Sequence, residues 1–395
     1  MENVTILNVL YNGAPVGTLA ETAGGKIAFQ YDKSWIENGF SISPFSLPLG
    51  DKVFISDKSL FDGLYGVFDD SLPDGWGRLL TDRMLMKNNI APESVTPLTR
   101  LAIVGKSGMG ALEYEPEIIE DNGFTGSALS LDELAAECNK IMNDRPAEHL
   151  DDVFRLGGSS GGARPKAFLN YDCKPWIVKF PSHYDSEDIG KQEYDYNICA
   201  GKCGIEIPEV HLFDSAIWSG YFGCARFDRI VPADKSVLTE TSGTSDAATL
   251  PTGKLHMVSV AALLETSHRY PNLDYSILFK LTDLLAGDAG QLLELYRRMC
   301  FNVFAHNRDD HSRNFSFLYD EAAHAWRLTP AYDMTYSNSI GGEHATTVNG
   351  NGRDPGLADV AEVGKRAGIS ASKAKKIAEE IGEIVNSELR TYLKA

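Results

Sequence analysis

A run of polar residues at 306–314 constrains the fold of this chain more than any other stretch. It reads His-Asn-Arg-Asp-Asp-His-Ser-Arg-Asn, between the mainly apolar segments 301–304 and 315–318. Large apolar side chains are usually buried, whereas charged ones are seldom buried without partners. The run is therefore predicted to be a polar loop held between two buried elements. The plain alternative is an ordinary polar turn.

The spacing within this run is typical of a phosphoryl-transfer loop. Asp309 and Asn314 are five positions apart, as in kinase loops whose Asp accepts the proton of the substrate hydroxyl and whose Asn holds Mg²⁺. His311 lies between them, as in the D-x-H-x-x-N loops of lipid and small-molecule kinases. We predict Asp309, His311 and Asn314 to be catalytic residues, with Asn314 also a metal ligand.

A second metal ligand is predicted further along the chain. Asp333 lies 19 residues after Asn314, past an expected hairpin. Mg²⁺ is typically held by one or two carboxylates together with substrate phosphates. Asp333 is therefore predicted to bind Mg²⁺ beside ATP, and an Asp in a simple turn is the alternative.

A run of glycines and serines at 157–162 precedes Lys166. Glycines permit close backbone approach to a ligand, and successive N–H groups can cradle a phosphate. The run is neither a Walker A motif nor a strict GxGxxG. We predict that Gly161, Gly162, Ala163 and Lys166 bind ATP, and a flexible surface loop is the alternative.

Four further residues follow the order expected of an ATP site. Lys179 lies among apolar strand residues, 22 positions after Gly157, where a lysine can reach nucleotide phosphates from the next strand. Glu193, on the following helix, could orient it as an ion pair. Arg226 and Phe227 lie in a connector that suits a hinge beside the adenine. An edge-strand lysine and an exposed helical glutamate are the alternatives.

Composition excludes several classes of function. The 395 residues carry 37 Lys and Arg against 55 Asp and Glu, a net charge of −18. A chain this acidic does not bind nucleic acid or an anionic membrane through bulk charge. No apolar stretch is long enough for a transmembrane helix, and no signal peptide is evident. With six scattered cysteines and no zinc spacing, we expect a cytoplasmic protein with reduced, mostly buried thiols.

The pattern along the chain predicts an α+β fold. Residues 1–115 are expected to form a β-rich subdomain and 116–230 a small lobe with the Gly-rich run, whereas 231–395 are expected to form a helical lobe with the catalytic loop. Asn12-Gly13 predicts a hairpin. The polar stretch 232–254 is expected to be a surface loop.

Taken together, these motifs resemble the HipA family of serine/threonine kinases, the toxins of bacterial HipBA-type toxin–antitoxin pairs. The resemblance covers nearly the whole chain and rests on these segments: 15–19, 72–77, 161–166, 178–181, 225–229, 309–314 and 328–333. It implies a bilobed, protein-kinase-like fold. It also implies ATP and Mg²⁺ as cofactors, Lys179 on the phosphates, Asp309 as base, and Asn314 and Asp333 on the metal.

The resemblance carries implications for regulation and partners. Ser159, or the adjacent Ser160, stands where the family has a serine that is autophosphorylated, which switches the kinase off. The implied partner is a small, basic helix-turn-helix antitoxin (HipB-like), through which the chain would reach DNA only indirectly. The implied substrate is a protein such as an aminoacyl-tRNA synthetase, and no membrane is involved.

Two other functions remain open. A kinase of small molecules or lipids would share the D-x-H-x-x-N loop, although the N-terminal segments and the Gly-rich run count against it. A non-catalytic module that only holds a repressor is the second alternative, against which the complete set of predicted catalytic residues argues.

Overall fold

The computed structural model describes residues 2–56, 60–119, 129–231 and 253–393. Contacts divide the chain into two compact units. The first unit comprises Met1–Glu187, Phe213–Val258 and Ala262–Glu265. The second unit comprises Asp188–Leu212, Ser259–Ala261 and Thr266–Ala395. The predicted division at residues 115 and 230 stays a prediction.

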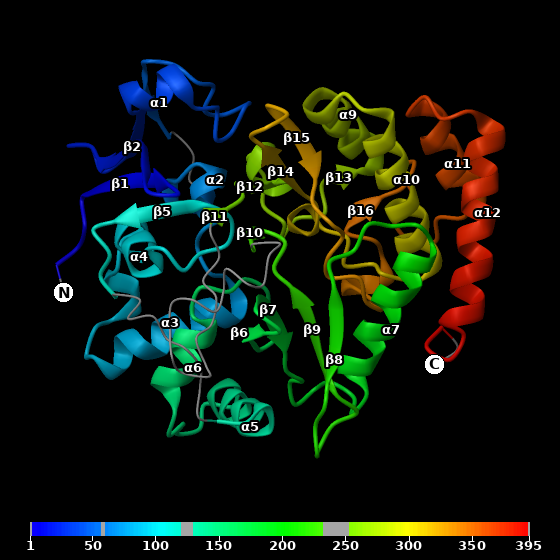
Figure 1. Ribbon diagram of the computed structural model, residues 1–395, viewed down its shortest axis with the longest axis horizontal. Helices are drawn as coiled ribbons and strands as arrows, with labels where there is room; N and C mark the ends of the chain where they lie inside the picture. The colour runs from blue at the N-terminus through cyan, green and yellow to red at the C-terminus, as the bar shows by residue number, and fades with distance from the viewer. Residues whose placement is uncertain (1, 57–59, 120–128, 232–252, 394–395) are drawn as a thin grey trace. The chain divides into compact units, whose positions relative to one another are not determined.

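The first unit begins with a five-stranded antiparallel sheet in the order β4-β3-β2-β1-β5. Its strands are β1 (Ile6–Tyr11), β2 (Ala14–Glu21), β3 (Ile27–Tyr31), β4 (Val53–Ile55) and β5 (Leu112–Glu115) (Figure 1). The predicted hairpin is confirmed, because Asn12 and Gly13 join β1 to β2 with φ of 48° and 80°. Two positive φ values are what a tight hairpin turn needs.

Helices and two further sheets complete the first unit. The helices are α1 (Lys33–Asn38), α2 (Gly66–Asp69), α3 (Gly75–Lys87), α4 (Pro97–Val104), α5 (Leu131–Met142) and α6 (Leu150–Gly157). The remaining strands are β6 (Lys166–Tyr171), β7 (Lys174–Lys179), β9 (Tyr221–Ala225), β10 (Arg229–Ile230) and β11 (Gly253–Lys254). Strand β7 pairs antiparallel with both β6 and β9. The predicted loop 232–254 lies outside the described residues except for its last two, which form β11.

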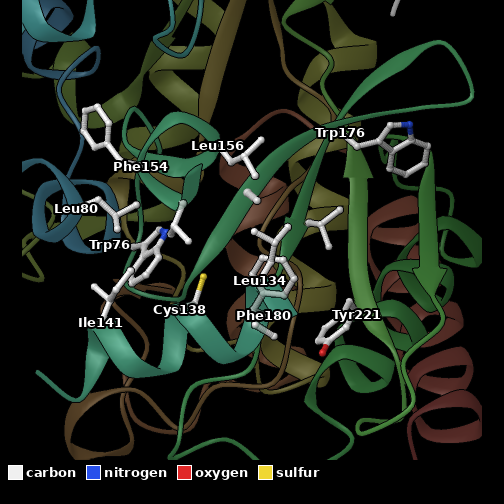
Figure 2. Packing of buried hydrophobic residues seen from close by; sticks show 14 of the residues in the cluster. Trp76, Leu80, Leu134, Cys138, Ile141, Phe154, Leu156, Trp176, Phe180 and Tyr221 are labelled. Atoms are coloured by element: carbon white, nitrogen blue, oxygen red, sulfur yellow. The ribbon is translucent and has the colours of Figure 1, made fainter. Parts of the chain in front are cut away.

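The core of the first unit joins helices α3, α5 and α6 to strands β6, β7 and β9. Figure 2 shows Trp76 and Leu80 of α3 near Cys138 of α5 and Phe154 of α6. The side chain of Trp76 is 1% exposed. Helix α3, although early in the sequence, therefore shares its core with the elements that flank the Gly-rich run. Burial of large apolar side chains of this kind stabilises each by about 1.5–3 kcal/mol.

The second unit is mainly helical. Its elements are α7 (Ile189–Lys202), β13 (Leu273–Asp274), α9 (Tyr275–Ala286), α10 (Ala289–Phe304), β14 (Ser316–Asp320), β15 (Ala325–Leu328), β16 (Thr346–Thr347), α11 (Leu357–Arg366) and α12 (Ala371–Glu388). Three short elements carry residues of both units or adjoin their boundary: β8 (Val210–Phe213), β12 (Met257–Ser259) and α8 (Val260–Leu263). Strands β14 and β15 form an antiparallel hairpin. The prediction of a mixed α+β chain is confirmed.

Two expectations from composition can be compared with the structure. Five cysteines are buried and Cys173 is exposed, which agrees with the expectation of mostly buried thiols. Within the part of the chain that the structure describes, no helix combines the length and apolarity needed to cross a membrane.

Candidate active site

The Gly-rich run forms the connection between α6 and β6 in the first unit. Gly157 ends α6, and a Cβ there would lie 2.6 Å from the carbonyl oxygen of Lys166. Gly162 has a φ of +84°, in the left-handed region that favours glycine. The backbone path of this loop therefore requires glycine at both positions.

The two serines of the loop differ in their surroundings. Ser159 is half-buried, and its hydroxyl donates to the carbonyl oxygen of Ser107 at 3.0 Å. Ser160 is 1% exposed, and its hydroxyl donates to the carbonyl oxygen of Gly157 at 2.6 Å. Ser159 also lines a cavity of about 400 Å³. Of the two, Ser159 is the serine that a phosphate donor can reach with less rearrangement.

Two lysines lie directly opposite each other where the loop enters the sheet. Lys166, the first residue of β6, pairs in register with Lys179, the last residue of β7. Residues opposite each other in an antiparallel pair project from the same face, and like charges there are unfavourable. The Lys166 ammonium donates to the carbonyl oxygen of Gly161, and the Lys179 ammonium lies 5.6 Å from the centroid of the Phe222 ring. Two lysine side chains are therefore placed on one face of the sheet, where the Gly-rich loop ends.

The predicted hinge residue Arg226 points its side chain into a buried ion cluster. Its guanidinium donates to Asp228 at 2.9 and 2.8 Å, and Arg229 donates to the same carboxylate at 2.8 Å. Burial alone would raise the pKa of Asp228, but Arg226 and Arg229 outweigh it and hold that pKa well below its usual range. The ATP-binding role of Arg226 and Phe227 stays a prediction.

In the second unit, the polar run follows the end of α10 and forms a loop, as predicted. The side chain of Asp309 is 58% exposed. The side-chain amide nitrogen of Asn314, Nδ2, donates to the backbone carbonyl oxygen of Asp309 at 2.7 Å. His311 accepts the N–H of Arg313 at Nδ1, and its Nε2 lies 3.9 Å from Asp309 Oδ1. An accepting Nδ1 places the proton of neutral His311 on Nε2. The structure thus brings Asp309, His311 and Asn314 together.

Asp310, which no sequence motif singled out, fixes this loop. Asp310 is 1% exposed, and its carboxylate accepts from the Tyr275 hydroxyl at 2.9 Å and from the Thr346 N–H at 3.1 Å. His344 Nδ1 lies 3.0 Å from the same carboxylate. Of two adjacent aspartates, one therefore anchors the loop and the other faces outward. The Asp-Asp doublet was the available signal, but sequence alone does not say which carboxylate is buried.

Asp333 lies on a segment tied to the same loop. The side-chain amide of Asn307 donates to the carbonyl oxygen of Asp333 at 3.4 Å and to Asn302 at 3.0 Å. Asn197 of α7 donates to the carbonyl oxygen of Met334 at 3.2 Å. Asp333 has a φ of +52°, a conformation that non-glycine residues adopt mainly where surrounding contacts impose it. These contacts fix the position of the Asp333 backbone, from which the side chain extends.

The residues present fit a magnesium ion that receives most of its ligands from a bound substrate. In the described ranges, no group of three or more His, Cys, Asp or Glu side chains is placed to hold a metal. The bond from Nδ2 to the Asp309 carbonyl oxygen orients the Asn314 amide, whose Oδ1 is the atom that can bind a cation. One carboxylate, one amide oxygen and phosphate oxygens form the kind of set that Mg²⁺ accepts.

Glu193 lies on α7 and is 1% exposed. It is therefore not the exposed helical glutamate that was the alternative to an ion-pairing role. It lies in the second unit and Lys179 in the first. Their pairing stays a prediction, as do the individual roles of the site residues.

Two parts of the chain match models of known protein families. Residues 158–389 match the HipA-like C-terminal domain, and residues 7–115 match the HipA N-terminal domain. "Putative kinase Y4dM" of Sinorhizobium fredii is 24% identical over 364 residues, covering 85% of this chain and 78% of that protein. "Putative kinase Y4mE" of the same organism is 25% identical over 370 residues, covering 84% and 77%.

A solved structure shares the fold. HipA of Shewanella oneidensis MR-1, solved with HipB and operator DNA as a toxin–antitoxin complex, superposes with a TM-score of 0.69. It is 18% identical, and the match covers 97% of this chain and 90% of that one. The predicted HipA-like fold is thereby confirmed. Because the C-terminal family match alone spans more than half of the sequence, the chain belongs to the HipA family.

Proposed function

We propose that this chain is an ATP- and Mg²⁺-dependent serine/threonine protein kinase. The observation that carries the proposal is the pair of adjacent aspartates. Asp310 is buried and anchors the loop through its carboxylate, while Asp309 is presented to solvent with Asn314 bound to its backbone. A carboxylate exposed on a fixed loop is suited to accept a proton from a substrate hydroxyl.

In the proposed reaction, the hydroxyl oxygen of a substrate serine or threonine attacks the γ-phosphorus of ATP, and Asp309 accepts the proton of that hydroxyl. The new O–P bond forms while the bond from the γ-phosphorus to the β,γ-bridging oxygen breaks, and ADP leaves. Lys166 and Lys179 neutralise phosphate charge beside the Gly-rich loop. When bound, Mg²⁺ supplies further charge neutralisation, with Asn314 and Asp333 as its protein ligands. Catalysis of this kind depends on positioning and charge more than on covalent chemistry.

The family supports a further proposal about the cellular role. Since the Shewanella HipA structure contains HipB and operator DNA, we propose that this chain is the toxin of a toxin–antitoxin pair. Its net charge of −18 suits a small, basic helix-turn-helix antitoxin, which would supply the DNA contact. Its substrate would be a protein of translation such as an aminoacyl-tRNA synthetase.

A labelling experiment tests the kinase proposal. The purified chain is incubated with Mg²⁺ and γ-labelled ATP, with a cell extract separated into proteins and small molecules as acceptors. We expect label on serine or threonine of protein. Label only in the small-molecule or lipid fraction would contradict the proposal and favour a metabolite kinase.

Self-modification gives a prediction with a matched pair of variants. If Ser159 is the autophosphorylated residue, Ser159→Ala should remove the added phosphate, because Ser159 is half-buried beside a cavity whereas Ser160 is fully buried. Ser160→Ala should keep it. Peptide mapping by mass spectrometry after incubation with Mg²⁺ and ATP reads the site. Phosphate retained in Ser159→Ala and lost in Ser160→Ala would reverse the assignment.

A further inference from the structure

The N-terminus of α3 contains an aspartate that does not cap its own helix. Asp74 occupies the N-cap position of α3, where an Asp side chain usually accepts a backbone N–H of the first turn. Here it makes no such bond. Its carboxylate instead accepts the backbone N–H of Gly162, in the Gly-rich loop. The side chain is therefore used to hold the loop rather than the helix.

Trp76, the second residue of α3, holds the same part of the loop. The backbone N–H of Trp76 donates to the carbonyl oxygen of Gly162 at 2.8 Å. Its indole nitrogen donates to the carbonyl oxygen of Lys166 at 3.1 Å. Both polar groups of the Gly162 backbone are thus bound by α3. Because the Trp76 ring lies in the core (Figure 2), these donors are rigidly placed.

The two glycines that flank Trp76 allow this approach. A Cβ at Gly75 would lie 2.5 Å from the carbonyl oxygen of Gly162, and one at Gly77 would lie 2.1 Å from that of Ser160. Real Cβ atoms do not approach backbone oxygens so closely, so only glycine fits at both positions. The segment 73–77 is therefore shaped to receive the Gly-rich loop.

Another side of the loop is less well packed. Gly158 and Ser159 line the cavity of about 400 Å³, together with Pro73, Arg78 and Thr81 of the α3 region. A glycine-rich segment beside a cavity loses much conformational entropy when it is ordered. The contacts from Asp74 and Trp76 supply that order before any ligand arrives.

We propose that Asp74 is a positioning residue for nucleotide binding, and that the N-terminus of α3 is a dock that holds the Gly-rich loop ordered before nucleotide binds, with the Gly162 N–H used by Asp74 rather than by phosphate. The inference rests on the proposed nucleotide site. Asp74 lies within residues 7–115, which match the HipA N-terminal domain. The Gly-rich loop that it holds lies in residues 158–389, which match the HipA-like C-terminal domain, apart from Gly157. A loop ordered in advance binds its ligand more tightly, because less ordering remains to be done on binding.

The test compares Asp74→Ala and Asp74→Asn with the wild type and with Asp51→Asn, an exposed aspartate of the same unit. Two quantities are measured: amide hydrogen exchange of peptides covering 158–165 without nucleotide, and the Kd for Mg²⁺ with a non-hydrolysable ATP analogue by calorimetry. Because a charge-assisted hydrogen bond is lost, Asp74→Ala should speed exchange and weaken Kd, each about tenfold. Asp74→Asn keeps a neutral acceptor and should weaken Kd about threefold. Asp51→Asn should match the wild type.

Three results would count against this inference or its basis. Exchange and Kd unchanged in Asp74→Ala, with the protein folded by its Tm, would overturn the dock. A tighter Kd in Asp74→Ala would also overturn it, because the carboxylate would then be competing with phosphate. No nucleotide binding by the wild type would overturn the proposed function instead. The exchange comparison needs no nucleotide and would still decide for or against the dock.

Discussion

Replacement of Asp309 by Asn is expected to reduce the rate of phosphate transfer about a thousandfold while leaving the fold intact. The amide cannot accept the hydroxyl proton, and general-base catalysis typically contributes about 10²–10⁴ in rate. Because the Asp309 side chain is 58% exposed, its replacement should change the free energy of unfolding by no more than about 0.5 kcal/mol. Initial rates with γ-labelled ATP and a thermal unfolding curve measure the two quantities.

The neighbouring aspartate provides a matched control for this variant. Asp310→Asn makes the same chemical change one residue away, but Asp310 is buried and accepts hydrogen bonds from Tyr275 and Thr346. We expect it to lower the free energy of unfolding by about 1–3 kcal/mol, together with activity. Equal activity in Asp309→Asn and the wild type would show that Asp309 is not the base.

Replacement of Asp228 by Asn should destabilise the first unit by about 3–5 kcal/mol, since it removes the anion from a buried cluster of two arginines. Asp228 and Arg226 are 1% and 9% exposed, and Arg229 donates to the same carboxylate. The cluster also binds residues 108–110, because Asp228 accepts the N–H of Gly110 at 2.8 Å and Arg226 donates to the carbonyl oxygen of Gly108 at 3.2 Å. Urea unfolding measures the loss.

The same cluster predicts a pH dependence whose sign is fixed by the pKa of Asp228. That pKa is held below its usual range in the folded chain. A depressed folded pKa gives stability that is present above the unfolded pKa, near 4, and is lost as pH falls through the folded pKa. Wild-type stability should therefore drop below about pH 4, and this component should be absent from Asp228→Asn.

The control for this variant is the same substitution at an exposed ion pair. Asp144 accepts from Arg83 at 2.6 Å, and its side chain is 81% exposed. Exposed pairs contribute about 0–1 kcal/mol, so Asp144→Asn should leave the unfolding curve nearly unchanged. Similar small effects at both positions would contradict the structural role assigned to the cluster.

Local signals predicted the parts of the fold that depend on neighbouring residues. Asn12-Gly13 makes the hairpin, because the turn conformation is set by those two residues. Helix α5 likewise starts at a local signal, because its N-cap Ser130 forms a capping box with Glu133 three residues later.

Long-range contacts could not be predicted from the same information. The docking of Asp74 on Gly162 joins residues 88 positions apart, and the bond from Arg226 to Gly108 spans 118. No local pattern specifies such partners, because they depend on how separate elements pack. The same limit explains why the sequence predicted a polar loop at 306–314 but did not distinguish the anchoring Asp310 from the exposed Asp309.

The most direct test of the central claim is the intact mass of the purified chain before and after incubation with Mg²⁺ and ATP, beside Asp309→Asn. The proposed kinase predicts an added phosphate on the wild type, mapping to Ser159, and no addition to the variant. The starting mass shows whether the chain is already phosphorylated, in which case phosphatase treatment precedes the assay. An unmodified chain that gains no phosphate and transfers none to protein, alone or with its antitoxin, would contradict the account.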